Sequence, residues 1–161
     1  EVRSLGADCP FFIYNTPCYA SGIGDELLPI ELDMRGLRIL MIKPNEGVST
    51  KEAYGGIIRH PEAANAIIEK VQSISNLKEL LTSYPSIFIN DFEQSVFPLH
   101  PSIAAIKKRL QDANALYACM SGSGSTVFGL FEDDSEGRTD SLLRMLEQEF
   151  TSMVLLNDSL G

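Results

Sequence analysis

The sequence predicts an α+β domain of the ferredoxin-like, or split βαβ, type: an antiparallel sheet with helices on one face and extra helices in the first crossover. Three observations support this fold class. Residues 37–43 form an almost unbroken apolar run, which is typical of a buried strand. Two further apolar runs, 116–120 and 126–131, enclose a short Ser/Gly loop, as in a β-hairpin. Between and after these strands, apolar residues recur at helical spacing.

The first part of the chain predicts a short helix and a small hairpin. Asp8 lies two positions before Pro10, so its carboxylate is placed to cap a helix that has the proline in its first turn. Residues 19–30 carry Gly22-Ile-Gly24 between apolar residues, which predicts two short strands joined by a glycine-containing turn. The chain begins at Glu1 with a sequence typical of a domain interior, so we expect a fragment of a longer protein.

The crossover after residues 37–43 predicts several helices. Ser49 or Thr50 is placed to begin a helix that runs through Ile58. A second helix follows Pro61, and a third, short helix covers residues 77–81. The second helix has one apolar face, which consists of Ala64, Ile67, Ile68 and Val71.

Asn90-Asp-Phe-Glu93 has the spacing of a capping box and predicts a helix that begins there and runs toward Phe97. Two prolines interrupt this helix, and helical spacing resumes at Ser102. The C-terminal part predicts a solvated acidic turn at 132–137, an amphipathic helix and a last short strand at 153–156. The apolar positions of these two later helices are Ile103, Ile106 and Leu110, then Leu142, Leu143, Leu146 and Phe150.

Composition limits the classes of partner. With 22 acidic and 13 basic residues the net charge is −9, which argues against nucleic acid or an anionic membrane as the main partner. A phosphorylated small molecule needs only a few local donors and remains compatible. No apolar stretch is long enough to span a bilayer. The three cysteines form no C-x-x-C pair, which favours reduced thiols and a cytoplasmic protein.

The loop Ser121-Gly122-Ser123-Gly124-Ser125 has two interpretations. It is the tip of a hairpin, where glycine and serine are common for local reasons. A tip made only of small residues also lets several backbone N–H groups converge on a phosphate. The pattern alone leaves both open.

Other polar and aromatic residues carry similar alternatives. Asp8 stands beside apolar residues and is placed either to cap a helix or to accept a proton from a substrate hydroxyl, and the two roles are compatible. Tyr54 is either a half-buried aromatic residue or a ring that stacks on a planar ligand. Lys43 and Lys51 read as solvated side chains. The two histidines, His60 and His100, have no neighbours at metal-ligand spacing.

Several motifs occur in an order that resembles the C-terminal part of a GHMP-superfamily small-molecule kinase. The segments are Leu5-Gly-Ala-Asp-Cys-Pro-Phe-Phe12, Gly22-Ile-Gly24-Asp-Glu, Gly47-Val-Ser-Thr-Lys-Glu-Ala-Tyr54, Asn90-Asp-Phe-Glu93 and Met120-Ser-Gly-Ser-Gly-Ser-Thr-Val-Phe-Gly-Leu-Phe131. The resemblance covers nearly the whole chain. Each motif is weak alone, and their order and spacing make the match specific.

The resemblance implies a phosphotransferase with an alcohol acceptor, most like the family members that phosphorylate a hydroxyl of a cytidine-diphosphate-linked methylerythritol in the non-mevalonate route to isoprenoids. It implies that Asp8 is the catalytic aspartate and that residues 121–125 form a loop near the ATP phosphates. It implies that Tyr54 stacks on the cytosine ring and that Thr50 also belongs to the substrate site. ATP and Mg²⁺ are the implied cofactors, held mainly by an N-terminal domain.

The resemblance also implies a division of the chain. Residues 1–34 correspond to the end of an N-terminal kinase domain and its connection, and residues 35–161 to the GHMP kinase C-terminal domain. The family's main ATP-phosphate loop and its N-terminal lysine are absent from this sequence. We therefore expect these 161 residues to be inactive by themselves and to need their own N-terminal domain as a partner.

Two departures and two alternatives remain. Ser125 stands where the family usually has proline, and Asn15-Thr16-Pro17 replaces a glycine-containing turn. One alternative is another GHMP kinase, acting on homoserine, mevalonate or a sugar. The other is a non-catalytic ferredoxin-like module that binds a small ligand.

Overall fold

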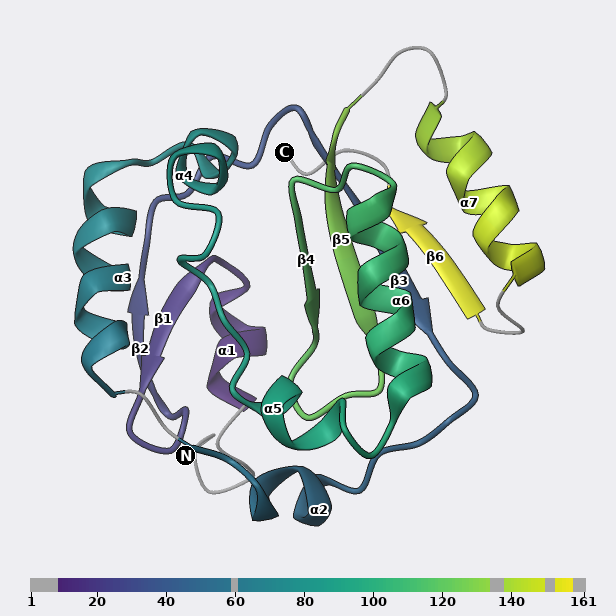
Figure 1. The fold of residues 1–161 in the computed structure, drawn as a ribbon. Helices are drawn as coiled ribbons and strands as arrows, with labels where there is room; N and C mark the ends of the chain where they lie inside the picture. The colour runs from purple at the N-terminus through teal and green to yellow at the C-terminus, as the bar shows by residue number, and fades with distance from the viewer. Residues whose placement is uncertain (1–8, 59–60, 134–137, 150–152, 158–161) are drawn as a thin grey trace.

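The structure is a computed structural model that describes residues 9–58, 61–133, 138–149 and 153–157. Its first part is a short helix and a two-stranded antiparallel sheet (Figure 1). The helix α1 covers Cys9–Tyr14, and the strands β1 and β2 cover Cys18–Ser21 and Glu26–Pro29. Gly22 and Gly24 in the connecting turn have φ angles of 66° and 97°, which glycine adopts without strain. The predicted hairpin is therefore confirmed.

A four-stranded antiparallel sheet forms the centre of the molecule (Figure 1). Its strands lie in the order β4-β5-β3-β6. They cover Leu37–Lys43 (β3), Tyr117–Met120 (β4), Val127–Glu132 (β5) and Met153–Asn157 (β6). β3 pairs with both β5 and β6, and its two faces pack against different hydrophobic clusters, Leu40 and Ile42 on one side and Leu37 on the other, which explains its nearly continuous apolar sequence.

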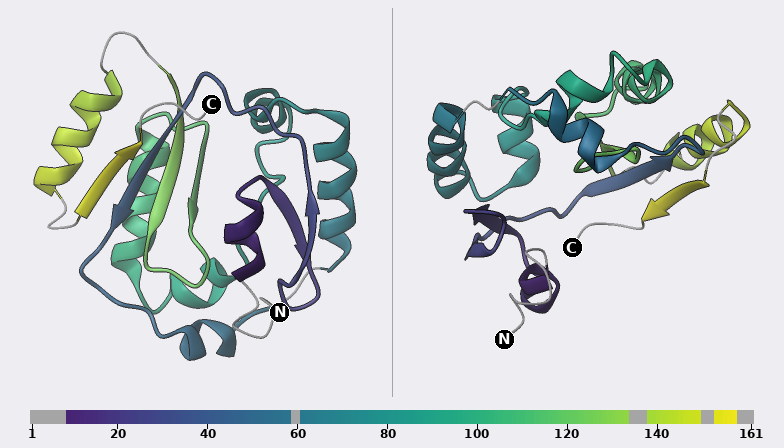
Figure 2. Two further views of the ribbon diagram at one scale, coloured as in Figure 1. Left: turned by 180° about the vertical axis from the view of Figure 1, so that it is seen from behind. Right: turned by 90° about the horizontal axis from the view of Figure 1, so that it is seen from below.

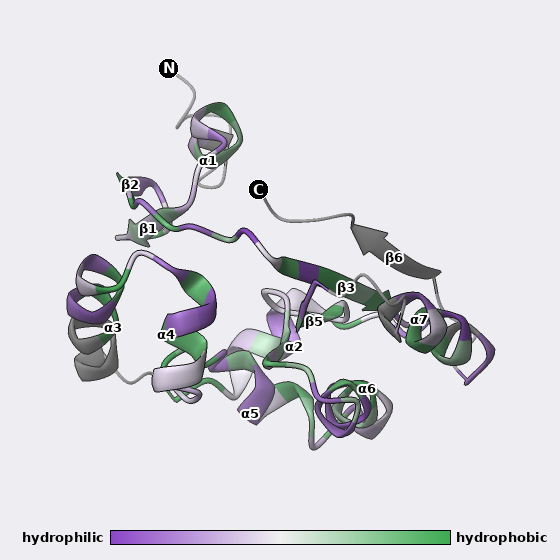
Figure 3. Cartoon of the chain, turned by 90° about the horizontal axis from the view of Figure 1, so that it is seen from above, coloured by the Kyte–Doolittle hydropathy of each residue, from purple (hydrophilic) through white to green (hydrophobic). Residues whose placement is uncertain are grey.

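Within the described residues, six further helices connect and cover these strands. They are α2 (Thr50–Gly55), α3 (Pro61–Ser73), α4 (Leu77–Ser83), α5 (Phe92–Val96), α6 (Pro101–Asp112) and α7 (Arg138–Glu149). In Figure 3, α5, α6 and α7 lie on the same side of the sheet, and α1 with the β1–β2 hairpin lies on the opposite side. The view from below in Figure 2 shows the same arrangement.

The main core lies between one face of the sheet and the helices α2, α5, α6 and α7. Alternate strand residues point to this face, among them Leu40, Ile42 and Val127, which are 0% exposed. They meet the predicted stripe of α6, which is Ile103, Ile106 and Leu110, and Leu146 of α7. The stripe of α6 is therefore confirmed as core-facing, as are Leu142, Leu143 and Leu146 of α7, while Phe150 lies outside the described residues.

A second hydrophobic cluster joins the opposite side of the strands to α3 and α4. It contains Leu37 and Leu130 from the sheet and Leu80 from α4, which pack with Val71 of α3. Backbone hydrogen bonds link the chain ahead of β3 to the start of α4, since Asp33 N–H donates to Ser75 O and Leu77 N–H donates to Asp33 O. The sequence predicted helices on one face of the sheet only, whereas α3 and α4 pack against the other face.

One predicted helix boundary is wrong. α2 ends at Gly55 rather than continuing through Ile58. The next residue, Gly56, is the C-cap, where glycine commonly ends a helix, and a Cβ there would lie 2.7 Å from Cβ of Ser95 in α5. The interruption expected between residues 97 and 102 is confirmed, since α5 ends at Val96 and α6 begins at Pro101, where a missing N–H costs nothing.

Candidate functional site

The loop 121–125 connects β4 to β5 and is the tip of an antiparallel hairpin. Ser121 N–H donates to Thr126 O at 2.8 Å, and Gly124 N–H donates to Ser121 O at 3.0 Å. Gly122 and Gly124 have φ angles of 54° and 90°, so both positions favour glycine. The hairpin interpretation of the loop is confirmed.

The two glycines of the loop differ in their surroundings. A Cβ on Gly122 would meet nothing within 4 Å, so this position is open to an approaching ligand. A Cβ on Gly124 would lie 2.8 Å from Met120 Sδ and 3.4 Å from Val48 Cγ2. Gly124 therefore anchors the loop against the protein, while Gly122 presents its backbone outward.

Asn90 holds the loop from the side. Its Nδ2 donates to Met120 O at 2.7 Å and to Gly122 O at 2.8 Å. Its Oδ1 accepts from Phe92 N–H at 3.0 Å, which fixes the orientation of the amide. The Asn90 side chain therefore connects the start of α5 to Met120 and Gly122, the residues on either side of Ser121.

Glu93 fixes the strand that leads into the loop. Its Oε1 accepts from Met120 N–H at 2.9 Å, and its Oε2 accepts from Lys107 Nζ at 2.5 Å. The two side chains are 14% and 23% exposed, so the pair is largely shielded from water. In such surroundings, removing one partner costs more than it does at the surface.

These contacts correct the expected capping box. Glu93 does not return to the helix start but bonds to Met120, which is 27 positions later in the sequence. The helix α5 begins after Asp91, whose side chain makes no capping hydrogen bond. Sequence reasoning missed the role of both residues because spacing of three positions describes a local contact, whereas their partners lie on β4 and in the loop.

The helix α2 lies beside the loop through its first residue. Thr50 Oγ1 and Ser123 Oγ are 3.4 Å apart. Ser49 occupies the N-cap position but makes no side-chain capping bond. The ring of Tyr54 is 56% exposed and meets Phe92 edge to face, with 4.8 Å between centroids. The ring of Tyr54 therefore packs against Phe92 of α5, and much of its surface stays accessible.

The segment between β3 and α2 is fastened to the start of α6. His100 Nδ1 is 2.5 Å from Glu46 Oε1, and Ser102 Oγ donates to Glu46 Oε2. The hydrogen bond to Glu46 raises the pKa of His100, and the bonds from Ser102 and His100 lower the pKa of Glu46. Nε2 of His100 is buried and lies 3.6 Å from Glu52 Oε2, beyond hydrogen-bond distance. No sequence pattern indicated this cluster.

Two residues of β4 lie in the protein interior. Burial raises the pKa of the Cys119 thiol to about 11, so the thiol stays protonated at neutral pH. Burial likewise raises the pKa of Tyr117. Cys119 is 5% exposed, in agreement with its interpretation as a small buried residue. Neither group is placed to act as a nucleophile.

The remaining candidates are distributed as follows. Asp8 and His60 lie outside the residues that the structure describes. Lys43 and Lys51 are exposed, as expected for solvated side chains. Across the described ranges, no group of three or more His, Cys, Asp or Glu side chains could hold a metal ion. The described part of the chain thus brings together Thr50, Tyr54 and the loop 121–125, supported by Asn90 and Glu93.

No helix in the part of the chain covered by the structure has the length and apolar character required to cross a membrane.

Comparison with known proteins identifies the family to which the chain belongs. Residues 63–150 match the family described as "GHMP kinases C terminal". A protein of Bacteroides thetaiotaomicron named 4-diphosphocytidyl-2-C-methyl-D-erythritol kinase is 47% identical over 133 residues, which are 83% of this chain and 46% of that protein. A Parabacteroides distasonis protein of the same name is 42% identical over 141 residues, or 88% of this chain and 49% of that protein. The chain spans about half the length of the curated relatives it matches.

Solved structures show the same fold. A crystal structure of 4-(cytidine 5'-diphospho)-2C-methyl-D-erythritol kinase aligns with a TM-score of 0.68 at 23% identity, covering 99% of this chain and 56% of that one. A homoserine kinase from Cytophaga hutchinsonii aligns with a TM-score of 0.62 at 19% identity, covering 83% of this chain and 45% of that one. At these identities the likeness concerns the fold alone.

Proposed function

The chain belongs to the GHMP kinase C-terminal family, and on that basis we propose that it forms part of an ATP-dependent kinase that phosphorylates a hydroxyl of 4-diphosphocytidyl-2-C-methyl-D-erythritol. The observation that carries the proposal is the 47% identity to a kinase of that name over 83% of this chain. The reaction belongs to isoprenoid precursor synthesis by the non-mevalonate pathway. We place the protein in the cytoplasm, where its described free cysteines, Cys18 and Cys119, stay reduced.

The proposed substrate carries a planar base, and the site offers a partner for it. The accessible ring of Tyr54 is suited to stack on cytosine, and Phe92 holds it from the edge. Thr50 joins α2 to Ser123, so the base-stacking residue and the glycine loop belong to one surface. This neighbourhood supports the assignment of Thr50 and Tyr54 to substrate binding.

The loop 121–125 is proposed to approach the phosphates of ATP. ATP supplies the phosphoryl group, and catalysis of its transfer depends mainly on positioning and on electrostatic stabilisation. Gly122 has open space beside it, and Asn90 fixes its carbonyl, so the loop meets an anion in a set conformation. We assign Mg²⁺ and the main ATP-phosphate contacts to the N-terminal domain.

Asp8 is proposed as the catalytic aspartate that accepts the proton of the substrate hydroxyl. A positioned base of this kind contributes on the order of 10²–10⁴-fold to the rate. Without the family's N-terminal lysine and main phosphate loop, Asp8 cannot assemble the site. The 161 residues alone are therefore expected to be inactive.

We propose that the chain divides at residue 35. Residues 1–34 belong to the end of the N-terminal domain and its connection, and residues 35–161 form the C-terminal domain. The exposed apolar side chains Phe12, Ile13 and Ile23 support the first assignment, because such a surface is typical of an interface. For the second, the strand order β4-β5-β3-β6 with α7 between β5 and β6 supports the ferredoxin-like interpretation.

The test is phosphoryl transfer by the full-length protein that contains this chain. Changing Asp8→Asn keeps the shape of the side chain and removes the base. We expect ATP-dependent phosphorylation of the cytidylyl substrate to fall about 10²-fold or more, with unchanged thermal unfolding. Asp112→Asn, an exposed carboxylate on α6, is the matched control and keeps full activity. Wild-type rates for Asp8→Asn would refute the catalytic assignment.

A further inference from the structure

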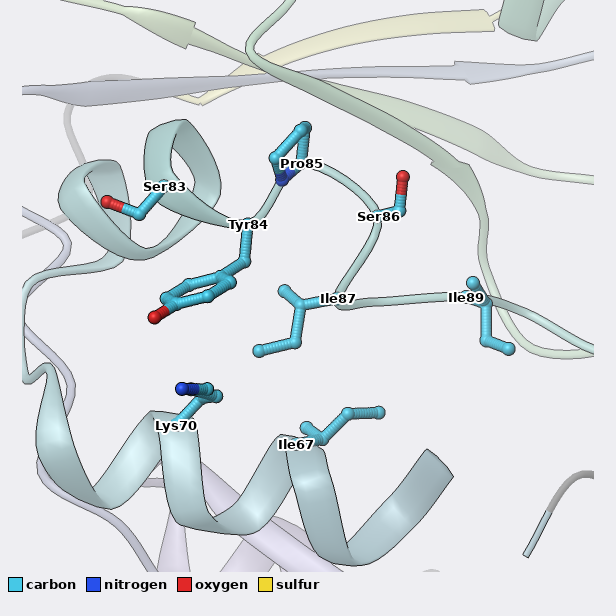
Figure 4. A pocket seen from close by; sticks show the side chains of 8 residues that line it. All are labelled: Ile67, Lys70, Ser83, Tyr84, Pro85, Ser86, Ile87 and Ile89. Carbon is cyan, nitrogen blue, oxygen red and sulfur yellow. The ribbon is translucent and has the colours of Figure 1, made fainter. Parts of the chain in front are cut away.

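A cavity of about 460 Å³ lies between α3 and the segment 83–89 (Figure 4). Ile67 of α3 faces Ile87 across this space, and Ile89 lies at the same end. The ring of Tyr84 and the side chain of Lys70 lie at the other end. The volume is in the range of sites that hold small organic ligands.

The isoleucine end of the cavity is apolar and accessible. Ile89 is 55% exposed, and Ile67 and Ile87 are partly buried members of the second hydrophobic cluster. A hydrocarbon or aryl group that entered here would remove apolar surface from water on both partners. The apolar end therefore favours a ligand with a hydrophobic body.

The opposite end carries a positive charge. Lys70 Nζ lies 4.7 Å from the centroid of the Tyr84 ring, a cation–π contact that holds the ammonium at the cavity wall. Within the part of the chain that the structure describes, Lys70 forms no ion pair. In a protein of net charge −9, a lysine without a carboxylate partner beside an apolar wall is complementary to an anionic group.

We propose that this cavity is a second ligand site, which binds a small amphipathic anion with its hydrophobic body between Ile67, Ile87 and Ile89 and its carboxylate or phosphate at Lys70. Its lining does not include Thr50, Tyr54 or the loop 121–125, and it adjoins the proposed kinase site only through Ile89, which precedes Asn90. The charge complementarity at one end and the apolar wall at the other favour this occupant over a purely apolar one.

Octanoate is the probe, because it joins an eight-carbon tail to a carboxylate. The full-length protein that contains this chain is titrated with octanoate while the isoleucine methyl signals are followed by NMR. We expect Ile67, Ile87 and Ile89 to shift saturably, and Ile103 and Ile106 of the main core to stay in place. Octan-1-ol carries the same tail without charge and binds about tenfold more weakly, because it lacks the charge-assisted bond to Lys70.

Two variants test whether the charge of Lys70, rather than the loss of any surface lysine, determines octanoate binding. Lys70→Met keeps the length of the side chain and weakens octanoate binding about tenfold, while its octan-1-ol binding is unchanged. Lys108→Met removes an exposed lysine of α6 and leaves both affinities unchanged.

Several results would overturn the proposal. These are equal affinity for octanoate and octan-1-ol, no effect of Lys70→Met, or shifts that begin in the main core. If the methyl signals of Ile67, Ile87 and Ile89 shift with protein concentration in the absence of octanoate, the cavity binds a second copy of the chain. That result would also overturn the proposal.

Discussion

Residues 9–29 and residues 37–133 both contain many apolar side chains, but they place them differently. In the first region Phe12, Ile13 and Ile23 are 76%, 66% and 81% exposed. In the second region Leu40, Ile42, Leu80, Ile103, Leu110 and Val127 are 0% exposed. Among the described residues, neither hydrophobic cluster includes a member of 9–29.

The difference follows from what each sheet packs against. β1 and β2 form a two-stranded sheet of their own, and such a hairpin is marginally stable in isolation. The four-stranded sheet is covered by helices and buries alternate residues on both sides. Apolar side chains are thus a source of stability in the second region and a contact surface in the first. Under our proposal, that surface packs on the N-terminal kinase domain.

The largest expected effect separates the two regions by stability. Leu110→Ala removes a fully buried side chain from the main core, and we expect the free energy of unfolding to fall by about 2–5 kcal/mol. Ile23→Ala removes a similar side chain from an exposed position, and we expect a change within about 0.5 kcal/mol. Urea unfolding of the 161-residue chain measures both. Equal losses would show that residues 9–29 belong to the same core.

A second, smaller effect compares a shielded ion pair with an exposed one. The basic partners of the two pairs, Lys107 and Arg109, both lie on α6. Glu93→Gln leaves Lys107 without its carboxylate, and we expect a loss of about 1–3 kcal/mol. Glu149→Gln breaks the exposed pair with Arg109, and we expect about 1 kcal/mol or less.

The position of Glu93 gives this variant a second measurable consequence. Because Glu93 also accepts from Met120 N–H, the amides of the loop 121–125 should exchange faster in Glu93→Gln and not in Glu149→Gln. Unchanged exchange at the loop would contradict the positioning role of Glu93, even if stability fell.

The smallest effect depends on pH. The pKa of His100 is raised from 6.5 by its bond to Glu46, so the folded state binds this proton more tightly. The resulting stabilisation is fully present below pH 6.5 and is lost as pH rises through the folded pKa. Glu46, whose pKa is lowered from 4.5, remains charged across this window.

We therefore expect His100→Gln to lower the free energy of unfolding more at pH 5.5 than at pH 8.5, as measured by urea titration at both values. In a protein that already carries Glu46→Gln, His100→Gln should lower the free energy of unfolding by nearly the same amount at both pH values. A loss that is larger at pH 8.5 would refute the role of the pair.

Local sequence patterns predicted the elements that depend on local chemistry. The apolar run of β3, the stripe of α6 and the glycine turn between β1 and β2 each follow from side-chain periodicity or backbone freedom. The hairpin formed by β4, the Ser/Gly loop and β5 was also readable, because two apolar runs enclose residues suited to a turn.

Contacts between distant segments could not be read in this way. Asn90 and Glu93 have the spacing of a local cap, yet their side chains bond to residues 120–122. Gly56 lies so close to α5 that a Cβ there would be 2.7 Å from Cβ of Ser95. The contact between His100 and Glu46 joins residues 54 positions apart. Each depends on how the elements pack, which periodicity does not specify.

The most direct test of the functional account is a substrate panel. The full-length protein that contains this chain is incubated with ATP and, in turn, with 4-diphosphocytidyl-2-C-methyl-D-erythritol, homoserine, mevalonate and galactose, and phosphorylated product is quantified. We expect transfer to the cytidylyl substrate alone, and a Tyr54→Ala variant to raise the KM for it. Transfer to homoserine, mevalonate or galactose in place of the cytidylyl compound would contradict the account.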